Sequence, residues 1–366
     1  MKKKNCITIS LGVLVLLVSV KVVFMHKKKE TDDASVVYYS QFPQNFQLTG
    51  EGFVIENELM RYPYRIHQLG DYVYVLDLHG EDHFCHLFYK NNFKNVVSFA
   101  QRGNGPQEVL QALCMDVQSE NSIWVFDTQK RNMIRWRYSV EQRNVIFEEC
   151  IHIEDKGVHS ANCTWGSDSL FFFTDGSGMS RILKCDIHGK ILERIGVIPT
   201  EKEVDDSKKG ALAQAWNGFV SYNPNRQLLV VVTQLGDVIE IYNLQNGTNK
   251  ILRGPLGEPI YQITREGWAV PTGFMGYSDV EVTDNYIYAV FHGRSFKDIA
   301  KDPQGTPDGG EFIHVYNHEG VPVCRMILDC AIYGIDVDEE NGIIWATDVN
   351  SEEQIVKYQL PEMLKL

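Results

Sequence analysis

The sequence lacks the short motifs that mark several classes of enzyme and metal-binding protein. It has no CxxC pair, no cysteine–histidine spacing typical of a zinc site, no G-x-S-x-G turn and no H-E-x-x-H helix. Seven of its eight cysteines follow the first thirty residues, and this odd number leaves at least one unpaired within a monomer. The spacing supports no disulfide framework, and we expect most cysteines to pack as small apolar side chains.

Positive charge is scarce outside the N-terminus. Residues 1–30 carry seven lysines and one glutamate, so the rest of the chain has a net charge of −19, against −13 for the whole. An acidic body repels phosphate backbones, which argues against nucleic acid as a partner. Hydrophobic residues at 44% and charged residues at 23% are close to the globular average, so a disordered or coiled-coil chain is excluded.

The N-terminus carries an apolar run, residues 7–25, with lysines on both sides. Its length is close to the roughly 20 residues that a membrane-spanning helix needs, and Lys21 lies near enough to one end to reach the interface. No small-residue cleavage site follows the run. We therefore predict an uncleaved signal anchor in residues 1–29 and a linker in residues 30–45. Cleaved secretion and a buried core helix are the alternatives.

A short polar turn followed by a run of β-branched and aromatic residues recurs six times. Successive repeats lie 47 to 59 residues apart, and most units contain four strand-like runs. Four short antiparallel strands in a unit of this size are typical of a β-propeller blade. The six segments are DYVYVLD (71–77), NSIWVFD (121–127), DSLFFFTD (168–175), RQLLVVVT (226–233), NYIYAVF (285–291) and NGIIWATD (341–348).

The predicted fold is therefore an all-β, six-bladed β-propeller over residues 46–360. The sixth unit contains only three strand-like runs, so we expect residues 46–56 to supply its outer strand and close the ring. A β-sandwich or a pair of smaller β-domains is the alternative, although no Pro/Gly-rich linker interrupts the repeat. The predicted blades span residues 60–101, 110–150, 158–198, 215–253, 275–330 and 331–358.

One blade carries a more specific signal. In SFAQRGNGPQEVLQALCMDVQSENSIWVFDTQKRNMIRW, residues 98–136, a GxGPxE-type loop leads into a strand, a turn and an I-x-V-x-D strand. This segment resembles the NHL-type and TolB-like six-bladed propellers of bacterial cell envelopes. The other blades share only the strand rhythm and the turn. The resemblance implies a six-bladed propeller exported to the envelope, and it supplies no catalytic set.

Loop length separates the two faces of the predicted propeller. The turns between first and second strands are short, whereas four long segments emerge on the opposite face, at 101–112, 199–217, 253–276 and 293–311. Elaborated loops on a rigid scaffold usually carry function, and exposed aromatic side chains suit sugar rings or protein partners. The same aromatics would also serve as packing between blades. The candidate binding residues are Arg65, His67, Arg102, Trp216, Trp268 and Tyr277.

A metal site in the central channel is a second hypothesis. Oxygen atoms of Asn162, Asn217 and Asp279, at the entrances of three inner strands, are suited to one Ca²⁺. Six-bladed lactonase-like hydrolases use a similar Asn/Asn/Asp set with an additional Glu. Here Arg65 and His67 stand at the corresponding entrance of the first blade, and no Glu is present there.

These observations predict a binding or scaffolding module of the cell envelope. Its N-terminal helix anchors it in the membrane with the propeller outside the cytoplasm, and its ligand is an envelope protein or a glycan. The alternative function is a calcium-dependent, lactonase-like hydrolase or lyase with its site in the central channel.

Overall fold

The structure, a computed structural model, describes residues 35–55, 59–119, 122–159, 161–167, 169–302, 305 and 307–365. The predicted signal anchor, residues 1–29, lies outside these residues. Within them, no helix has both the length and the apolar character that crossing a bilayer requires.

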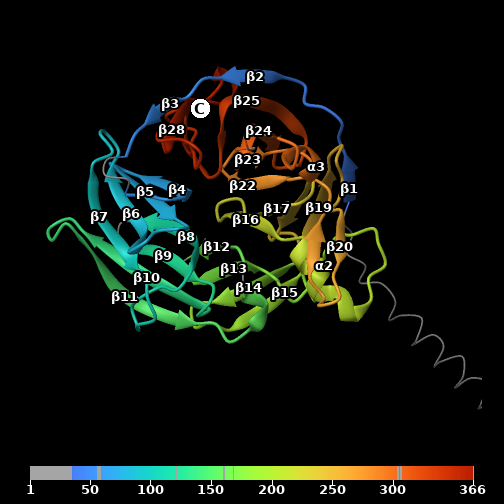
Figure 1. Ribbon diagram of the computed structural model, residues 1–366, viewed down its shortest axis with the longest axis horizontal. Coiled ribbons are helices and arrows are strands. Elements are labelled where there is room, and N and C mark those ends of the chain that lie inside the picture. Colours follow the sequence, from blue (N-terminus) through green and yellow to red (C-terminus); the bar gives the residue numbers. More distant parts are fainter. Residues whose placement is uncertain are drawn as a thin grey trace, which may run out of the picture. The chain divides into compact units, whose positions relative to one another are not determined.

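Six twisted sheets surround a central axis (Figure 1), which confirms the predicted six-bladed, all-β fold. In each blade the first strand lies nearest the axis and the later strands follow outward. Blades one to three are β4 (Pro63–Leu69), β5 (Tyr72–Asp77), β6 (His83–Tyr89) and β7 (Asn95–Gln101); β8 (Ala112–Ser119), β9 (Ser122–Asp127), β10 (Asn132–Ser139) and β11 (Asn144–His152); and β12 (Cys163–Ser167), β13 (Leu170–Thr174), β14 (Ile182–Asp186) and β15 (Ile191–Ile195).

Blades four and five each have a fifth, parallel strand from the N-terminal segment. Blade four is β16 (Gly218–Asn223), β17 (Leu228–Thr233), β18 (Val238–Asn243) and β19 (Thr248–Arg253), with β1 (Ser35–Tyr38) outside. Blade five is β22 (Tyr277–Val282), β23 (Tyr286–Phe291), β24 (Gly310–Asn317) and β25 (Pro322–Ile332), with β2 (Asn45–Leu48) outside. Blade six is β26 (Ile335–Asp338), β27 (Ile343–Thr347), β28 (Ile355–Gln359) and β3 (Glu51–Phe53).

The N-terminal segment therefore does more than the sequence suggested. Of residues 46–56, only Glu51–Phe53 adds to blade six, where it runs antiparallel to β28. Asn45–Leu48 pairs with blade five instead, and the expected linker, residues 30–45, contains β1 on blade four. The repeat pattern predicts one outer strand for the incomplete sixth blade, whereas the N-terminal segment adds a strand to each of three successive blades.

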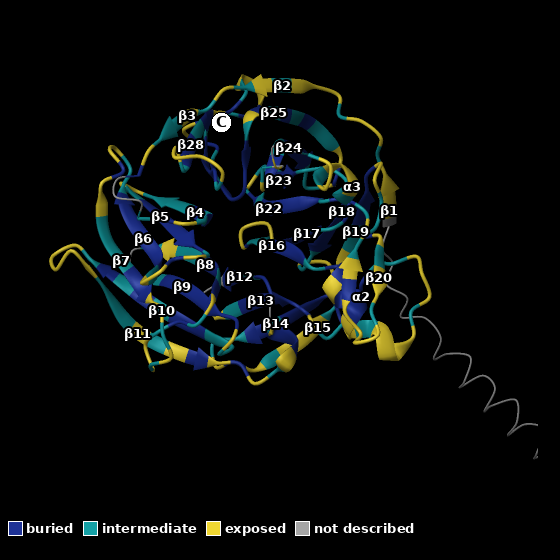
Figure 2. Cartoon of the chain, viewed as in Figure 1, coloured by how far each residue is buried: buried dark blue, intermediate teal, exposed yellow. Residues whose placement is uncertain are grey.

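Many residues of the blade strands are buried (Figure 2), and the buried apolar side chains of several blades pack together in a common core. All six residues of β17 are buried, as expected for a strand covered on both faces. Between blades two and three, the indoles of Trp124 and Trp165 stack with their centroids 4.7 Å apart. All seven cysteines of the described chain are free, and most are buried or half-buried in these layers.

A ring of side-chain hydrogen bonds joins neighbouring inner strands around the axis. Each blade uses a polar side chain to reach the backbone of the next blade, and the sixth returns to the first. We call this set the inner ring. Its bonds are His67 Nε2 to Met115 O (2.9 Å), Trp165 N to Asp116 Oδ2 (3.1 Å), Asn162 Nδ2 to Gly218 O (2.8 Å), Val282 N to Ser221 Oγ (3.2 Å), Ile335 N to Asp279 Oδ2 (2.9 Å), Val337 N to Glu281 Oε2 (2.7 Å) and Gln68 N to Asp336 Oδ2 (3.0 Å).

The long connections carry the remaining elements. Between blades three and four lie η3 (Asp206–Lys208) and α2 (Lys209–Ala215), and between blades four and five lies the hairpin of β20 (Tyr261–Ile263) and β21 (Ala269–Pro271). α3 (Phe296–Ile299) lies in the insertion between β23 and β24. Two single turns, η2 (Lys156–Val158) and η4 (Glu362–Leu364), complete the described helices.

Candidate functional site

Two hollows of the described chain contain residues that the sequence nominated. The first, which we call the α2 groove, has a volume of about 790 Å³ and lies between α2 and the β20–β21 hairpin. The second, which we call the central cavity, has a volume of about 190 Å³ and is lined by the inner strands around the axis. Trp268 and Asn217 line the α2 groove, whereas Arg65, His67, Asn162 and Asp279 line the central cavity.

Helix α2 forms one wall of the α2 groove. Its residues Ala211, Leu212 and Ala215 are buried, and together with Trp216 they pack on Val238 of blade four. The opposite wall is tied to the helix because Ala269 N donates a 2.8 Å hydrogen bond to Gln214 Oε1. The groove therefore has a fixed shape, built on the core of blade four.

The hairpin exposes an unusual number of apolar side chains. Trp268 is 63% exposed on the rim of the α2 groove. Four further apolar residues in the same connection are 38–51% exposed: Leu256, Ile260, Ile263 and Val270. Several exposed apolar side chains in one connection are a feature that interaction sites often have. Of the three sequence-predicted aromatic candidates, Trp268 is thus the one that the structure presents on its surface.

Two other aromatic candidates are buried, so the expectation that they are exposed on the long-loop face is wrong. Trp216 and Tyr277 are each 1% exposed. Trp216 is the C-terminal cap residue of α2, and its carbonyl accepts a 2.7 Å hydrogen bond from Arg181 Nη1. The hydroxyl of Tyr277 donates to Asp237 Oδ1 at 3.0 Å, and Tyr39 from the N-terminal segment donates to the same oxygen at 2.8 Å. Both aromatics pack between elements, which the sequence analysis kept as the alternative.

Arg102 belongs to neither hollow. Its Nε donates to Gly80 O at 2.8 Å, and its guanidinium lies 4.3 Å from the centroid of the Phe84 ring. Glu108 in the same loop accepts a 2.7 Å hydrogen bond from Gly105 N. Lys130 Nζ donates to three carbonyls of the same loop, so residues 103–108 form a braced turn.

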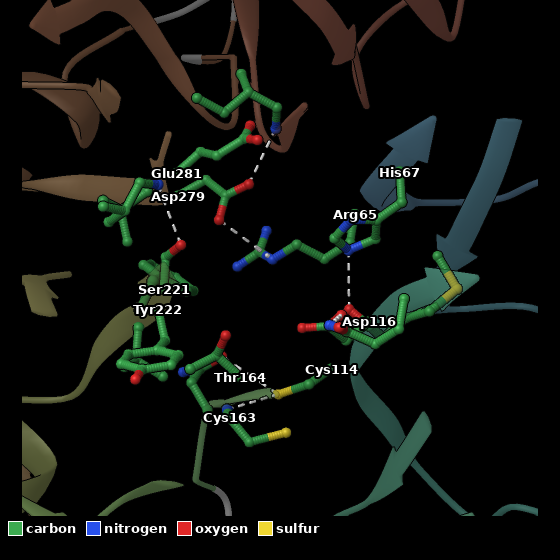
Figure 3. A pocket seen from close by; sticks show the side chains of 18 residues that line it. Arg65, His67, Cys114, Asp116, Cys163, Thr164, Ser221, Tyr222, Asp279 and Glu281 are labelled. Atoms are coloured by element: carbon green, nitrogen blue, oxygen red, sulfur yellow. Dashed lines mark hydrogen bonds and ion pairs between the residues drawn. The ribbon is translucent and has the colours of Figure 1, made fainter. Parts of the chain in front are cut away.

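In the central cavity, Arg65 projects among polar side chains from several blades (Figure 3). Its side chain is 11% exposed, and its Nε lies 3.5 Å from Asp279 Oδ1. Nη1 donates to the carbonyl of Tyr64 at 2.8 Å, and the guanidinium lies 3.9 Å from the centroid of the Tyr64 ring. Phe219 stacks against the guanidinium as well, at 4.7 Å. Stacking and ion pairing together fix the position of this cation.

Carboxyl groups lie in and beside the central cavity, and Glu281 is among those that line it. Burial raises the pKa of Asp336 to about 6, while His67, whose Nδ1 lies 3.8 Å from Asp336 Oδ2, opposes this rise. Burial and the neighbouring charge of Asp336 raise the pKa of Glu281 well above its usual value. Because the carbonyl of Met115 only accepts, Nε2 of His67 carries a hydrogen and Nδ1 faces the carboxyl group.

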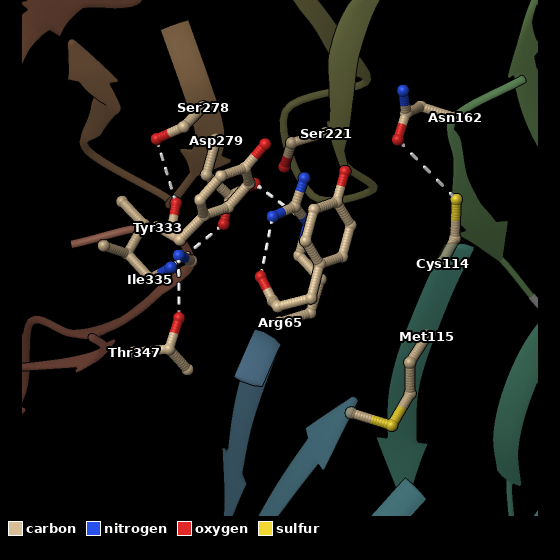
Figure 4. A network of polar contacts seen from close by, with 12 residues as sticks. Arg65, Cys114, Met115, Asn162, Ser221, Ser278, Asp279, Tyr333, Ile335 and Thr347 are labelled. Carbon is tan, nitrogen blue, oxygen red and sulfur yellow. Dashed lines mark hydrogen bonds and ion pairs between the residues drawn. The ribbon is translucent and has the colours of Figure 1, made fainter. Parts of the chain in front are cut away.

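The structure does not bring the three proposed calcium ligands together. Asn162 and Asp279 reach the central cavity, whereas Asn217 lies in the α2 groove and donates to Gln234 Oε1 at 3.3 Å. Both cavity residues are members of the inner ring (Figure 4), and Asp279 faces the guanidinium of Arg65. A cation beside Asp279 would lie next to a fixed positive charge. Within the described chain, no group of three His, Cys, Asp or Glu residues is arranged to hold a metal.

The TolB-like 6-blade propeller-like family matches residues 41–340, which is most of the chain. The chain belongs to this family. No curated protein sequence matches it.

Two solved structures have a similar fold to this TolB-like propeller. A DUF4221-family member from Bacteroides vulgatus has a TM-score of 0.54 and 12% identity, covering 86% of this chain and 97% of that one. A protein from Bacteroides fragilis NCTC 9343, described as a candidate exported protein, has a TM-score of 0.53 and 10% identity, covering 90% and 100%. At these identities the similarity shows the fold alone.

Neither Glu281 nor Asp336 is among the site residues predicted from the sequence. Both follow a pattern that is visible in the inner strands of the TolB-like propeller, where acidic residues alternate with apolar ones in DVEV (279–282) and IDVD (335–338). In a strand with period two, the apolar and the acidic residues lie on opposite faces, and here the acidic side chains reach the backbone of the next blade. This alternation is the signal that identifies them.

Replacing Asp336 with asparagine should alter the pH dependence of stability. A carboxyl group whose folded pKa is about 6, against an ordinary 3.8, favours the folded state below the ordinary value, and this contribution is lost as pH rises through 6. Asp336→Asn keeps an oxygen for Gln68 N and removes the titration. We expect the variant to match the wild type near pH 4 and to exceed its unfolding free energy near pH 7 by on the order of 2 kcal/mol.

Denaturant titrations at several pH values would measure this difference. Glu340→Gln, which removes an exposed carboxylate, is the matched control and should leave a profile parallel to that of the wild type. An Asp336→Asn profile that runs parallel to the wild type between pH 4 and 7 would contradict the assignment.

Proposed function

We propose that this TolB-like propeller is an exported, membrane-anchored binding module of the cell envelope that holds a protein or glycan ligand in the α2 groove. The observation that carries the proposal is Trp268, which is 63% exposed on the rim of a hollow of about 790 Å³. A large aromatic side chain beside a preformed groove is typical of a binding hot spot. The lysine-flanked apolar run at residues 7–25 supports the envelope location.

The composition of the groove suits a partially polar ligand. Trp268 and Ala213 offer apolar surface, while Gln214, Asn217 and Gln234 offer amide donors and acceptors. Aromatic faces beside amide groups are suited to sugar rings and to polar peptide side chains. No charged cluster dominates the lining, so we expect binding to depend weakly on salt.

Trp268→Ala should abolish most of the binding. Truncation of a true hot spot costs about 2 kcal/mol or more, which corresponds to a roughly 30-fold loss of affinity. A glycan array probed with the full-length protein would measure binding to sugars. For protein ligands, a photo-crosslinking amino acid at position 268 in intact cells would report contact directly.

Val140 supplies the matched control, because it is 55% exposed in the turn between β10 and β11, on blade two. Val140→Ala should leave glycan binding unchanged, and a crosslinker at position 140 should not form the adduct seen from position 268. Glycan binding that survives Trp268→Ala, together with identical adducts from the two positions, would show that the α2 groove is not the binding face.

A further inference from the structure

The central cavity contains two polar groups that the inner ring leaves unused. Nη2 of Arg65 is buried and has no hydrogen-bond partner in the described chain. Oε2 of Glu281 accepts from Val337 N, and Oε1 has no hydrogen-bond partner there either. In contrast, Asp116 is fully engaged, since its Oδ1 accepts a 2.6 Å hydrogen bond from Gln118 Nε2. A positively charged hydrogen-bond donor, Arg65 Nη2, and an acidic acceptor, Glu281 Oε1, are therefore free to contact a ligand.

We propose that the central cavity binds a small zwitterion of the α-amino acid class. Its carboxylate is held by Arg65 Nη2 and by the hydroxyl of Ser221, and its ammonium group is held by Glu281 Oε1. This site is separate from the α2 groove and does not depend on the function proposed for that groove.

More residues define the site for the ligand carboxylate than the site for its ammonium group. Arg65 already uses Nε toward Asp279 and Nη1 toward Tyr64 O, so Nη2 is the remaining nitrogen of its guanidinium group. In Figure 4 the guanidinium is directed between Asp279 and Ser221. Ser221 Oγ accepts from Val282 N, which leaves its hydroxyl hydrogen to donate. A buried arginine nitrogen left without a partner is costly, and a ligand carboxylate would satisfy it.

The ammonium end lies a short distance along the same strand. Asp279 and Glu281 are two residues apart on β22 and face the axis together, so about 7 Å of strand separates them. Because Arg65 lies against Asp279, its guanidinium and the Glu281 carboxyl group are near neighbours in the cavity. An α-amino acid, whose two charged groups are joined by a single carbon, is short enough to contact both. Burial raises the pKa of Glu281 in the empty cavity, and a ligand ammonium supplies the charge that its carboxylate form needs.

The size and charge of the cavity restrict the ligand further. About 190 Å³ admits a small amino acid and excludes an oligosaccharide or a folded peptide. Asp116, Asp279 and Glu281 outnumber Arg65 in the lining, so a simple dianion is disfavoured. Tyr64, Phe219 and Arg65 pack together at the long-loop end, whereas Gln118 at the other end is exposed. Entry is therefore from the face that carries the short turns.

Isothermal titration calorimetry on the full-length protein in detergent would test the site, with glycine, L-alanine and L-serine as probes. Ethylamine and propionate are the matched controls, since each retains one charged group of alanine. We expect saturable binding of at least one amino acid, and binding of ethylamine and propionate at least tenfold weaker than that of alanine. No binding by any of the three amino acids, or equal binding of alanine and either control, would overturn the proposal.

Variants locate the site. Glu281→Gln keeps an oxygen for Val337 N but removes the charge, so it should fold and lose at least tenfold in affinity for the bound amino acid. Ser221→Ala should weaken binding less. Trp268→Ala, in the α2 groove, should leave amino acid binding unchanged, so the two proposals fail independently. An unchanged affinity in Glu281→Gln would exclude the assigned ammonium site.

Discussion

Replacing Arg181 with methionine should lower the free energy of unfolding by about 3–5 kcal/mol. Arg181 precedes β14 in blade three, and its Nε lies 2.7 Å from Glu240 Oε1 on β18 of blade four. The two side chains are 3% and 1% exposed. Removing the guanidinium leaves the Glu240 carboxylate buried, and among the described side chains the Tyr242 hydroxyl, at 2.7 Å, is then its one hydrogen-bond partner.

The second bond of Arg181 adds to this loss. Its Nη1 donates to the carbonyl of Trp216, so the same side chain joins blade three to the end of α2. Methionine retains much of the apolar volume but none of the donors, and the Trp216 carbonyl is then buried without this partner. Chemical denaturation monitored by tryptophan fluorescence would measure the change.

A paired substitution separates the ion pair from general damage to the core. The double variant Arg181→Met/Glu240→Met removes both charges, and replacing a whole buried pair with apolar residues is often close to neutral. It should therefore be more stable than Arg181→Met alone. A double variant that is no more stable than the single one would show that the stranded charge is not the cause.

The strand pattern of the propeller could be predicted because it is local. Each blade repeats a polar turn, a run of apolar and β-branched residues and a second turn, and these choices depend on residues within a few positions. β13 and β17 fall inside the predicted segments 168–175 and 226–233. The long-loop segments also contain the extra elements, including α2 and the β20–β21 hairpin.

The burial of Trp216 was predictable in part. The segment KGALAQAW, residues 209–216, places Leu212, Ala215 and Trp216 at helical spacing, which indicates one apolar face. Residues 199–217 were predicted to be a long loop, which placed Trp216 at the surface. A helix of seven residues in a long connection is easily overlooked, because its periodicity extends over only two turns.

The central cavity depends on contacts that no local pattern specifies. Arg65 and Asp279 are more than two hundred residues apart, and they meet because blades one and five face the same axis. The parallel pairing of β1 with β19 is equally distant in sequence. Hydrophobic periodicity determines which face of a strand is buried, but it does not determine which strand lies opposite. The contact between Arg65 and Asp279 and the pairing of β1 with β19 could therefore be seen only in the three-dimensional structure.

Deleting residues 1–53 should destabilise the whole propeller far more than deleting residues 1–34. The longer deletion removes β1, β2 and β3, and with β3 it exposes the edge of β28 in blade six. It also removes Phe53. The centroid of its ring lies 4.5 Å from that of Phe93 in blade one and 6.1 Å from that of Trp345 in blade six. We expect the shorter chain, residues 54–366, to melt well below residues 35–366 and to aggregate through its open edge.

Phe53→Ala in the full-length protein measures how much the aromatic contacts of Phe53 contribute to closing the ring. Phe53 is half-buried, so its truncation should cost about 2 kcal/mol, less than the roughly 3–5 kcal/mol of a fully buried phenylalanine. Val54→Ala, at a 61% exposed neighbour, should have no measurable effect. Thermal unfolding followed by circular dichroism would rank the variants. If residues 54–366 melted within a few degrees of residues 35–366, the ring would be held closed by contacts between the inner strands and between blades, and β3 would serve only to cover an edge.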